Sequence, residues 1–205
     1  MKKVILLTMT TVLLCGTSCD MQDQVFQFVA HYRHMGPIDF DHTGEYDTGQ
    51  VVITDNDVKA ALDIPSSGEI KSVDVQALAL RLQILEGNTA QFVDIEASIV
   101  GTAGTFDIFK EYDYTVPLVG VDAPFIGLNS LISTGIAELK RQLEDLVIDE
   151  DRTSITVDVK LRPRGIGNRV HVRLHLLVDI SVIYEECISV PKEIFDNPVC
   201  GGTGS

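Results

Sequence analysis

Two long runs of alternating residues constrain the fold more strongly than any other feature of the chain. Apolar side chains occupy every second position over residues 155–161 and again over residues 170–182, with mostly polar residues between them. A period of two separates side chains onto the two faces of a β-strand, so both runs predict strands with one buried face. The turn from Pro163 to Asn168 that joins them predicts an antiparallel hairpin.

Further strands are expected upstream. Residues 92–100 alternate cleanly, with Asp94, Glu96 and Ser98 predicted to face outward. Residues 70–85 are also typical of a strand, but their alternation changes phase at Gln76-Ala77. A β-bulge at that point would return both apolar sets to one core. Shorter strands are expected near the following positions: 25–29, 51–53 and one or two within 105–119.

The helical signal is limited to two segments. Residues 129–147 carry apolar side chains at helical spacing and charged ones opposite, which predicts an amphipathic helix that Gly135 weakens near its start. A short helix is expected to begin at Asp55, with Thr54 as its cap. The chain is therefore predicted to be mainly β, an antiparallel β-sandwich, immunoglobulin-like or related, with one inserted amphipathic helix and a short N-terminal helix.

The first residues have the layout of a secretory signal. A cationic Met1-Lys2-Lys3 precedes an apolar run over residues 4–14, and small residues at 16–18 lead to Cys19. The apolar run is shorter than the roughly 20 residues that span a bilayer as a helix, which argues against a retained membrane helix. Residues 1–18 are therefore predicted to be a signal peptide.

Gly16-Thr17-Ser18-Cys19 resembles the lipobox of bacterial lipoproteins, although the family more often has Leu where this chain has Gly16. The resemblance implies diacylglycerol on the Cys19 thiol, cleavage before Cys19 and acylation of the new amino terminus. Several acyl chains anchor a protein stably, whereas one chain does so only marginally. A soluble secreted protein is the alternative. Cys15 follows Leu14 and fits the motif poorly.

The order of the predicted strands also resembles that of secreted β-sandwich lipoproteins of Gram-negative bacteria. The likeness covers about residues 50–186, and it implies a β-sandwich without implying an activity. The segments that carry it are Ile70-Lys-Ser-Val-Asp-Val, Phe92-Val-Asp-Ile-Glu-Ala-Ser-Ile, Ser154-Ile-Thr-Val-Asp-Val and Val170-His-Val-Arg-Leu-His. The predicted organisation is a signal peptide (1–18), a lipidated N-terminus, tether and first strand (19–50), the sandwich (51–186) and a C-terminal tail (187–205).

Charge and cysteine content narrow the functional classes. Without residues 1–18, the chain has 14 basic and 30 acidic residues, a formal charge of −16. Such a chain repels nucleic acid, so we expect no nucleic-acid partner. Cys187 and Cys200 form an even pair and predict a disulfide, which would close a loop of about 13 residues and stabilise by roughly 3 kcal/mol. Two unpaired thiols are the alternative.

Three histidines close in sequence are the weak candidates for metal ligands. His31, His34 and His42 lie near Asp39 and Asp41, and imidazole and carboxylate groups bind transition metals. On a strand, however, residues three apart point to opposite faces. The favoured interpretation is therefore solvated polar residues, and no metal or other cofactor is expected.

A second polar set lies on one face of the last predicted strand. His171, Arg173 and His175 alternate with its apolar residues, and the two imidazoles would lie roughly 13 Å apart, too far to share one ion. The favoured interpretation is a row of cross-strand charge partners, with Asp158 on the preceding strand as a candidate. A ligand-binding stripe on an exposed sheet face is the functional alternative.

No motif of nucleophilic, phosphate-binding or dinucleotide-binding enzymes is present. The acidic segments Asp55-Asn56-Asp57 and Asp149-Glu150-Asp151 lack the spaced oxygen ligands of a calcium loop, so they are interpreted as a helix start and a solvated turn. The sequence favours a lipid-anchored protein of the bacterial cell envelope, on the periplasmic face or the cell surface. Its sandwich would bind, without catalysis, an envelope protein or a surface polymer. The alternatives are an envelope hydrolase or metal-dependent enzyme using His31, His34 and His42, and a carrier of apolar ligands.

Overall fold

The computed structural model describes residues 21–117, 123–191 and 198–200. The predicted signal peptide and Cys19 lie outside these residues. The strands are β1 (Met21–Thr43), β2 (Asp47–Thr54), β3 (Glu69–Ile84), β4 (Phe92–Gly101), β5 (Gly104–Thr115), β6 (Ile126–Gly127), β7 (Ser154–Pro163) and β8 (Arg169–Pro191). The helices are α2 (Asp55–Leu62) and α3 (Ser133–Val147).

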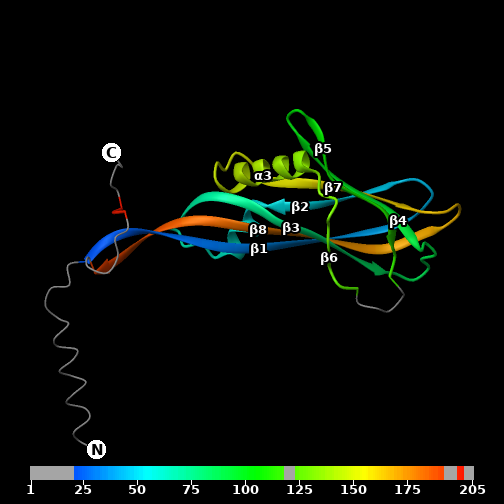
Figure 1. Cartoon of the computed structure of the whole chain (residues 1–205), viewed down its shortest axis with the longest axis horizontal. Helices are drawn as coiled ribbons and strands as arrows, with labels where there is room; N and C mark the ends of the chain where they lie inside the picture. Colours follow the sequence, from blue (N-terminus) through cyan, green and yellow to red (C-terminus); the bar gives the residue numbers. More distant parts are fainter. Residues whose placement is uncertain (1–20, 118–122, 192–197, 201–205) are drawn as a thin grey trace, which may run out of the picture. The chain divides into compact units, whose positions relative to one another are not determined.

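The strands form two four-stranded sheets, which confirms the predicted β-sandwich. One sheet has the order β1-β8-β3-β6 and the other β2-β7-β4-β5. Figure 1 shows β1, β8 and β3 running side by side. We call the side of each sheet that faces away from the core its outer face.

The chain divides into two compact units. Of the described residues, the larger unit contains 29–64, 70–117 and 123–183, and the smaller contains 21–28, 65–69, 184–191 and 198–200. Strands β1 and β8 contribute residues to both units. The larger unit holds the sandwich core and all the side chains of the candidate site described below.

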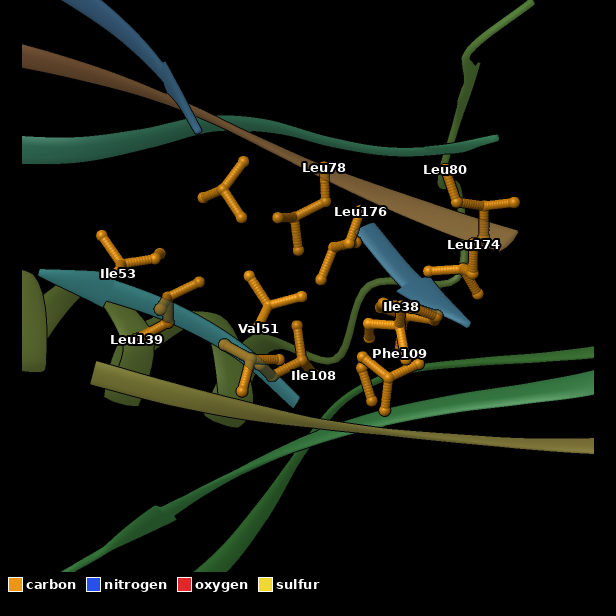
Figure 2. Packing of buried hydrophobic residues seen from close by; sticks show 14 of the residues in the cluster. Ile38, Val51, Ile53, Leu78, Leu80, Ile108, Phe109, Leu139, Leu174 and Leu176 are labelled. Atoms are coloured by element: carbon orange, nitrogen blue, oxygen red, sulfur yellow. The ribbon is translucent and has the colours of Figure 1, made fainter. Parts of the chain in front are cut away.

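The core of the larger unit is built from the inward rows of both sheets and one face of α3. Leu78 and Leu176 come from one sheet, Ile53 and Phe109 from the other, and Leu139 comes from α3. Figure 2 shows these side chains directed toward one another, in a cluster with almost no exposed surface. Burial of such side chains is the main favourable term in folding, at roughly 25 cal/mol per Å² of apolar surface.

The two closing strands are confirmed as strands, but the predicted hairpin is wrong. Strand β7 lies between β2 and β4 in one sheet, whereas β8 lies between β1 and β3 in the other. The turn that joins them therefore crosses from sheet to sheet, with Gly165 and Gly167 at positive φ. Alternation identifies the buried face of each strand but not its neighbour, so a hairpin and a crossing of the sandwich give the same pattern.

The phase change in β3 is also confirmed. Val73 and Leu78 are buried, whereas the two successive residues between these sets, Gln76 and Ala77, are both exposed. This shift of one residue allows both apolar sets of β3 to face the same core, as a bulge requires.

Both helices were predicted, and their ends have local causes. Helix α2 begins after Thr54, whose hydroxyl accepts from the Asp57 backbone N–H while the Asp57 carboxylate accepts from the Thr54 N–H. Helix α3 begins at Ser133, four residues later than expected. Its Gly135 lies so close to β5 that an added Cβ would stand 2.0 Å from the Asp107 carbonyl oxygen.

The N-terminal segment differs most from expectation. Residues 21–43, predicted as a tether with one short strand, form β1 as a continuous strand. Its inward row includes Tyr32, Ile38 and Phe40, which are buried in the core. His34, Gly36 and His42 share that row and hid the apolar alternation in the sequence.

The predicted disulfide between Cys187 and Cys200 is present, and it lies within the smaller unit. In the same unit the Val25 N–H donates to the Pro198 carbonyl at 2.8 Å, and the Cys200 N–H donates to the Asp23 carbonyl at 3.1 Å. Residues 198–200 are thus linked covalently to β8 through Cys187 and held against the first residues of β1 by backbone hydrogen bonds.

Candidate functional site

The outer face of the β1-β8-β3 sheet gathers the polar side chains of most interest. Arg169, His171, Arg173, His175 and Asp179 alternate along β8 with buried apolar residues, so they project together from the outer face. This confirms the predicted row. The same face holds half of the chain's eight arginines and three of its five histidines, namely Arg33, Arg81, Arg169, Arg173, His31, His171 and His175.

The charge partners of this row come from β1, so the prediction that Asp158 is the partner is wrong. Arg173 donates to both carboxylate oxygens of Asp39 at 2.6 and 2.9 Å, and Arg169 donates to both oxygens of Asp41 at 2.7 Å. Asp158 belongs to the other sheet and accepts from Gln50.

These bidentate pairs set the electrostatics along the edge of the sheet. The hydrogen bonds from Arg173 hold the pKa of Asp39 below its ordinary value, and those from Arg169 do the same for Asp41. Both carboxylates are solvent-exposed, so each pair contributes little to stability. A further pair, Arg33 with Asp179 at 3.0 Å, lies on the same face.

A hollow of about 620 Å³ opens around the Arg33–Asp179 pair. It is lined by His31 and Arg33 of β1, Asp179 of β8 and Gln76 of β3, so it spans three neighbouring strands. The Gln76 amide donates to the hydroxyl of Ser181 at 2.7 Å. The volume is within the range of about 300–1,000 Å³ typical of small-molecule sites. The lining combines donors with an acceptor carboxylate, a combination that suits a polar ligand.

Arg81 and His175 lie on the same outer face, several residues from the hollow along their strands. The Arg81 guanidinium lies over the Phe125 ring, 4.9 Å from its centroid. Burial, and then the positive charges of Arg81 and Arg173, hold the pKa of His175 below its ordinary value, while Asp39 acts in the opposite direction. This shift favours the neutral form of the His175 imidazole.

The three candidate metal ligands are not brought together. His31 is exposed beside the hollow on the outer face, whereas His34 and His42 belong to the inward row. His34 and His42 lie eight residues apart on one strand, roughly 26 Å. Within the described ranges, no group of three or more His, Cys, Asp or Glu side chains is placed to hold a metal ion.

His34 has instead a local structural partner. The hydroxyl of buried Tyr32 and the His34 Nδ1 are 2.8 Å apart, and burial lowers the pKa of His34. His42 lies edge-on to Phe40, with its ring centroid 6.4 Å from that of Phe40. These contacts account for both residues as parts of the β1 packing.

The acidic segments at 55–57 and 149–151 also have structural explanations. Asp55 and Asp57 lie in the first turn of α2, as expected of a helix start. Glu150 accepts from Lys59 at 2.5 Å, and Lys59 also lies 3.3 Å from Asp55.

Asp94 lies on the outer face of the second sheet, as predicted, yet it has no exposed surface. Its carboxylate accepts from Arg162 at 2.5 Å and Arg164 at 2.6 Å, and also from the backbone N–H of Asp113 at 3.1 Å. Burial alone would raise the pKa of Asp94, but these hydrogen bonds outweigh it and the pKa is lowered. Alternation placed Asp94 on the correct face, but gave no sign that two arginines from β7 and its following turn would cover it.

Glu96, two residues further along β4, is bound by two tyrosines. It accepts from the Tyr46 hydroxyl at 2.9 Å and from the Tyr112 hydroxyl at 3.3 Å. Burial, followed by the hydrogen bond to Glu96, raises the pKa of Tyr46 to about 12. This network ties β4, β5 and the β1–β2 connection together and is interpreted as structural.

Comparisons with known proteins add no functional information. No protein-family model and no curated protein sequence matches the chain. Among solved structures, the crystal structure of the decameric BFDV capsid protein has 10% identity and a TM-score of 0.34, covering 78% of this chain and 99% of that one. The infectious bursal disease virus VP2 subviral particle has 13% identity and a TM-score of 0.29, covering 82% and 38%. The assignment to the β-sandwich class accordingly rests on the two sheets themselves.

Proposed function

We propose that the chain is a lipid-anchored protein of the bacterial cell envelope whose β-sandwich binds an envelope component through the outer face of the β1-β8-β3 sheet. The observation that carries the binding part is the charge distribution. Four of eight arginines and three of five histidines gather on one sheet face of a chain with a formal charge of −14. The hollow lined by His31, Arg33, Gln76 and Asp179 gives that face a concave site.

The anchor part of the proposal rests on Gly16-Thr17-Ser18-Cys19, which resembles a lipobox. Attachment through lipid on Cys19 requires no membrane-spanning helix, and among the described helices none is long and apolar enough to cross a bilayer. The partner would be an envelope protein or a surface polymer, held near the membrane to which the lipid attaches.

Fractionation of cells tests the anchor. Wild-type protein should sediment with membranes and enter the detergent phase on phase partitioning. Cys19→Ser should fail to do both, because the acyl chains would have no thiol to attach to. Equal partitioning of the two proteins would overturn this part of the proposal.

A charge reversal on the proposed face tests binding. The Arg33 side chain is 72% exposed and lines the hollow, so Arg33→Glu should fold while repelling an anionic partner and removing the donors of the guanidinium. Lys160→Glu is the matched control, since it makes the same charge change at an exposed position on the other sheet. Co-sedimentation with isolated envelope fragments should fall for Arg33→Glu and be retained for Lys160→Glu. Equal values for both variants would contradict the proposed face.

A further inference from the structure

Arg81 differs from every other arginine of the chain, all eight of which lie in the part that the structure describes. Seven of them lie within 4.0 Å of a carboxylate: Arg33, Arg141, Arg152, Arg162, Arg164, Arg169 and Arg173. Among the described residues Arg81 has no such partner. An arginine without a carboxylate is conspicuous in a chain with 30 acidic residues.

The position of Arg81 is nevertheless held. Its guanidinium lies over the Phe125 ring, an arrangement that attracts a cation to the aromatic face and limits the freedom of a long side chain. Its Nε atom is buried and has no hydrogen-bond partner within the described ranges. A planar guanidinium whose position is restrained in this way retains the donor geometry that matches a carboxylate.

The surroundings of Arg81 favour an anion. His175 and Arg173 of β8 are close enough for Arg81 and Arg173 to disfavour the charged form of His175, and Asp39 of β1 is the acidic group that opposes them. Asp39 is already bound bidentately by Arg173. Among the residues that the structure describes, no neighbouring acid therefore neutralises the positive charge at Arg81.

The outer face between Arg81 and the hollow carries both apolar and hydrogen-bonding side chains. Leu177 lies between His175 and Asp179 along β8 and is partly buried, and Met35 of the neighbouring strand β1 is 47% exposed. About 13 Å along β8 from His175, Asp179 lines the hollow together with amide, imidazole and guanidinium groups. A sugar chain presents hydroxyls that both donate and accept, together with apolar ring faces, and can use all of these groups.

We propose that Arg81 binds a carboxylate of an acidic glycan that lies along the outer face of the β1-β8-β3 sheet toward the hollow at Arg33 and Asp179. This proposal rests on the proposed function and names the chemical class of the partner. A uronic acid residue would supply the planar oxyanion to Arg81, and the following sugar units would reach the hydrogen-bonding groups of the hollow.

Binding of the carboxylate should be coupled to a proton at His175. A negative charge beside Arg81 offsets the positive charges that disfavour protonation of His175, so the pKa of His175 should rise in the complex. Since the complex then takes up a proton more readily than the free protein, affinity should increase as the pH falls from neutral toward the pKa of His175 in the free protein.

Calorimetric titration of the full chain in detergent micelles tests the proposal with an oligogalacturonate as the probe. The uronate should bind the wild type, and its Kd should rise about tenfold or more in Arg81→Gln, because charge-assisted bidentate hydrogen bonds are lost. Lys160→Gln, which removes one positive charge from the other sheet, should leave the Kd unchanged. Arg81→Lys should bind with intermediate affinity, because lysine keeps the positive charge but cannot donate two parallel hydrogen bonds to a carboxylate.

The same titrations distinguish the alternatives. A neutral galactose oligomer of equal length should bind far more weakly than the uronate. Polyglutamate that binds as tightly as the uronate would overturn the glycan assignment in favour of an acidic peptide. Equal losses in Arg81→Gln and Lys160→Gln, or no uronate binding by the wild type, would overturn the proposal.

A thermal melt of Arg81→Gln that matches the wild type shows that any loss of binding is not a loss of folding. The imidazole resonances of His175 supply a second readout, because the uronate should raise their titration midpoint. The proposed function is tested separately, because it is contradicted if Arg33→Glu leaves envelope co-sedimentation intact. If only the predicted effect of Arg81→Gln on uronate binding is absent, the acidic-glycan proposal is wrong, but the outer face can still bind a different ligand.

Discussion

At the scale of single residues, the buried carboxylate of Asp94 depends on the hydrogen bonds that its neighbours donate. The carboxylate has no exposed surface, while its two partners, Arg162 and Arg164, are each about two-fifths exposed. The arginines thus act as a cover that keeps water from Asp94 and supplies the hydrogen bonds that water would have made. If the negative charge of Asp94 were removed, both arginines would lose their charge-assisted hydrogen bonds to this buried position.

Asp94→Asn should therefore lower the free energy of unfolding by about 2–4 kcal/mol at pH 7. Asp158→Asn is the control: it changes an acid of the same sheet whose hydrogen bond with Gln50 is exposed, and should cost about 0.5 kcal/mol or less. Urea unfolding of both variants measures the difference. Equal costs would show that the arginine cover contributes nothing.

The pH dependence of the same pair has a definite sign. The pKa of Asp94 is held below its ordinary value of 3.8, so its contribution is complete above that value and is lost as the pH falls through the folded-state pKa. The difference in unfolding free energy between wild type and Asp94→Asn should thus shrink below pH 3.8. A difference that stays constant down to the lowest pH at which both proteins fold would contradict this account.

Gly135 illustrates a residue whose role is steric. Glycine is unfavourable inside a helix by roughly 1 kcal/mol relative to alanine, yet an added Cβ here would overlap the Asp107 carbonyl. Gly135→Ala should destabilise the protein in spite of the better helix propensity. Thr134→Ala, at the neighbouring exposed position of α3, should be neutral or slightly stabilising. Thermal melts of the two variants give the comparison, and a stabilised Gly135→Ala would show that the helix can move away from β5.

At the scale of elements, the disulfide of the smaller unit keeps residues 198–200 in position for their hydrogen bonds with β1. The bond closes a loop of 13 residues and attaches Cys200 to β8, while backbone hydrogen bonds join residues 198–200 to Asp23 and Val25 of β1. A loop of this length corresponds to roughly 3 kcal/mol on the chain-entropy model. The backbone hydrogen bonds of residues 198–200 alone are too few to offset the entropy of ordering that segment.

Reduction of Cys187–Cys200, or the double change of both cysteines to serine, should release residues 198–200 from β1. Hydrogen exchange should then accelerate at the Val25 and Cys200 amides, which donate across this contact. Amides of β4, in the larger unit, should retain their protection and serve as the internal control. Unchanged exchange at Val25 after reduction would show that the hydrogen bonds suffice without the covalent link.

Elements were easier to predict from the sequence than the connections between them. Alternation over residues 154–182 gave both long strands and their buried faces, because strand periodicity is a local property. Pairing is not local, so the same alternation led to a hairpin although β7 and β8 lie in different sheets. Gly36 and His42 interrupt the apolar inward row of β1, and at Gly36 the facing sheet approaches too closely for a side chain. Indeed, a Cβ on Gly36 would stand 2.5 Å from Val51.

The candidate site likewise contains features that follow from one strand alone and features that depend on which strands are neighbours. The projecting row of β8 could be predicted, because its side chains follow from one strand's parity. Its partners Asp39 and Asp41 could not, because they depend on β1 being the neighbour of β8. The absence of a carboxylate beside Arg81, within the part of the chain that the structure describes, depends on the neighbouring strands, and the sequence shows only a charged residue within Leu80-Arg81-Leu82.

At the scale of the whole molecule, the net negative charge of the chain is a reason to expect attachment to a membrane through lipid. A chain with this excess of acids would be repelled by anionic headgroups and would not stay at a membrane by electrostatic attraction. Lipid on Cys19 would supply the attachment that the surface charge opposes. The arginine- and histidine-containing sheet face would then be the part of an acidic domain best suited to an anionic component of the envelope.

The most direct measurement of the central claim is the mass of the amino-terminal peptide of the protein isolated from its native membrane. Processing at the predicted lipobox should give a peptide that begins at Cys19 and carries a diacylglyceryl group and an acylated amino terminus. The same peptide should be lost from Cys19→Ser. A peptide that begins elsewhere, or an unmodified Cys19, would contradict the account of this chain as a lipid-anchored envelope protein.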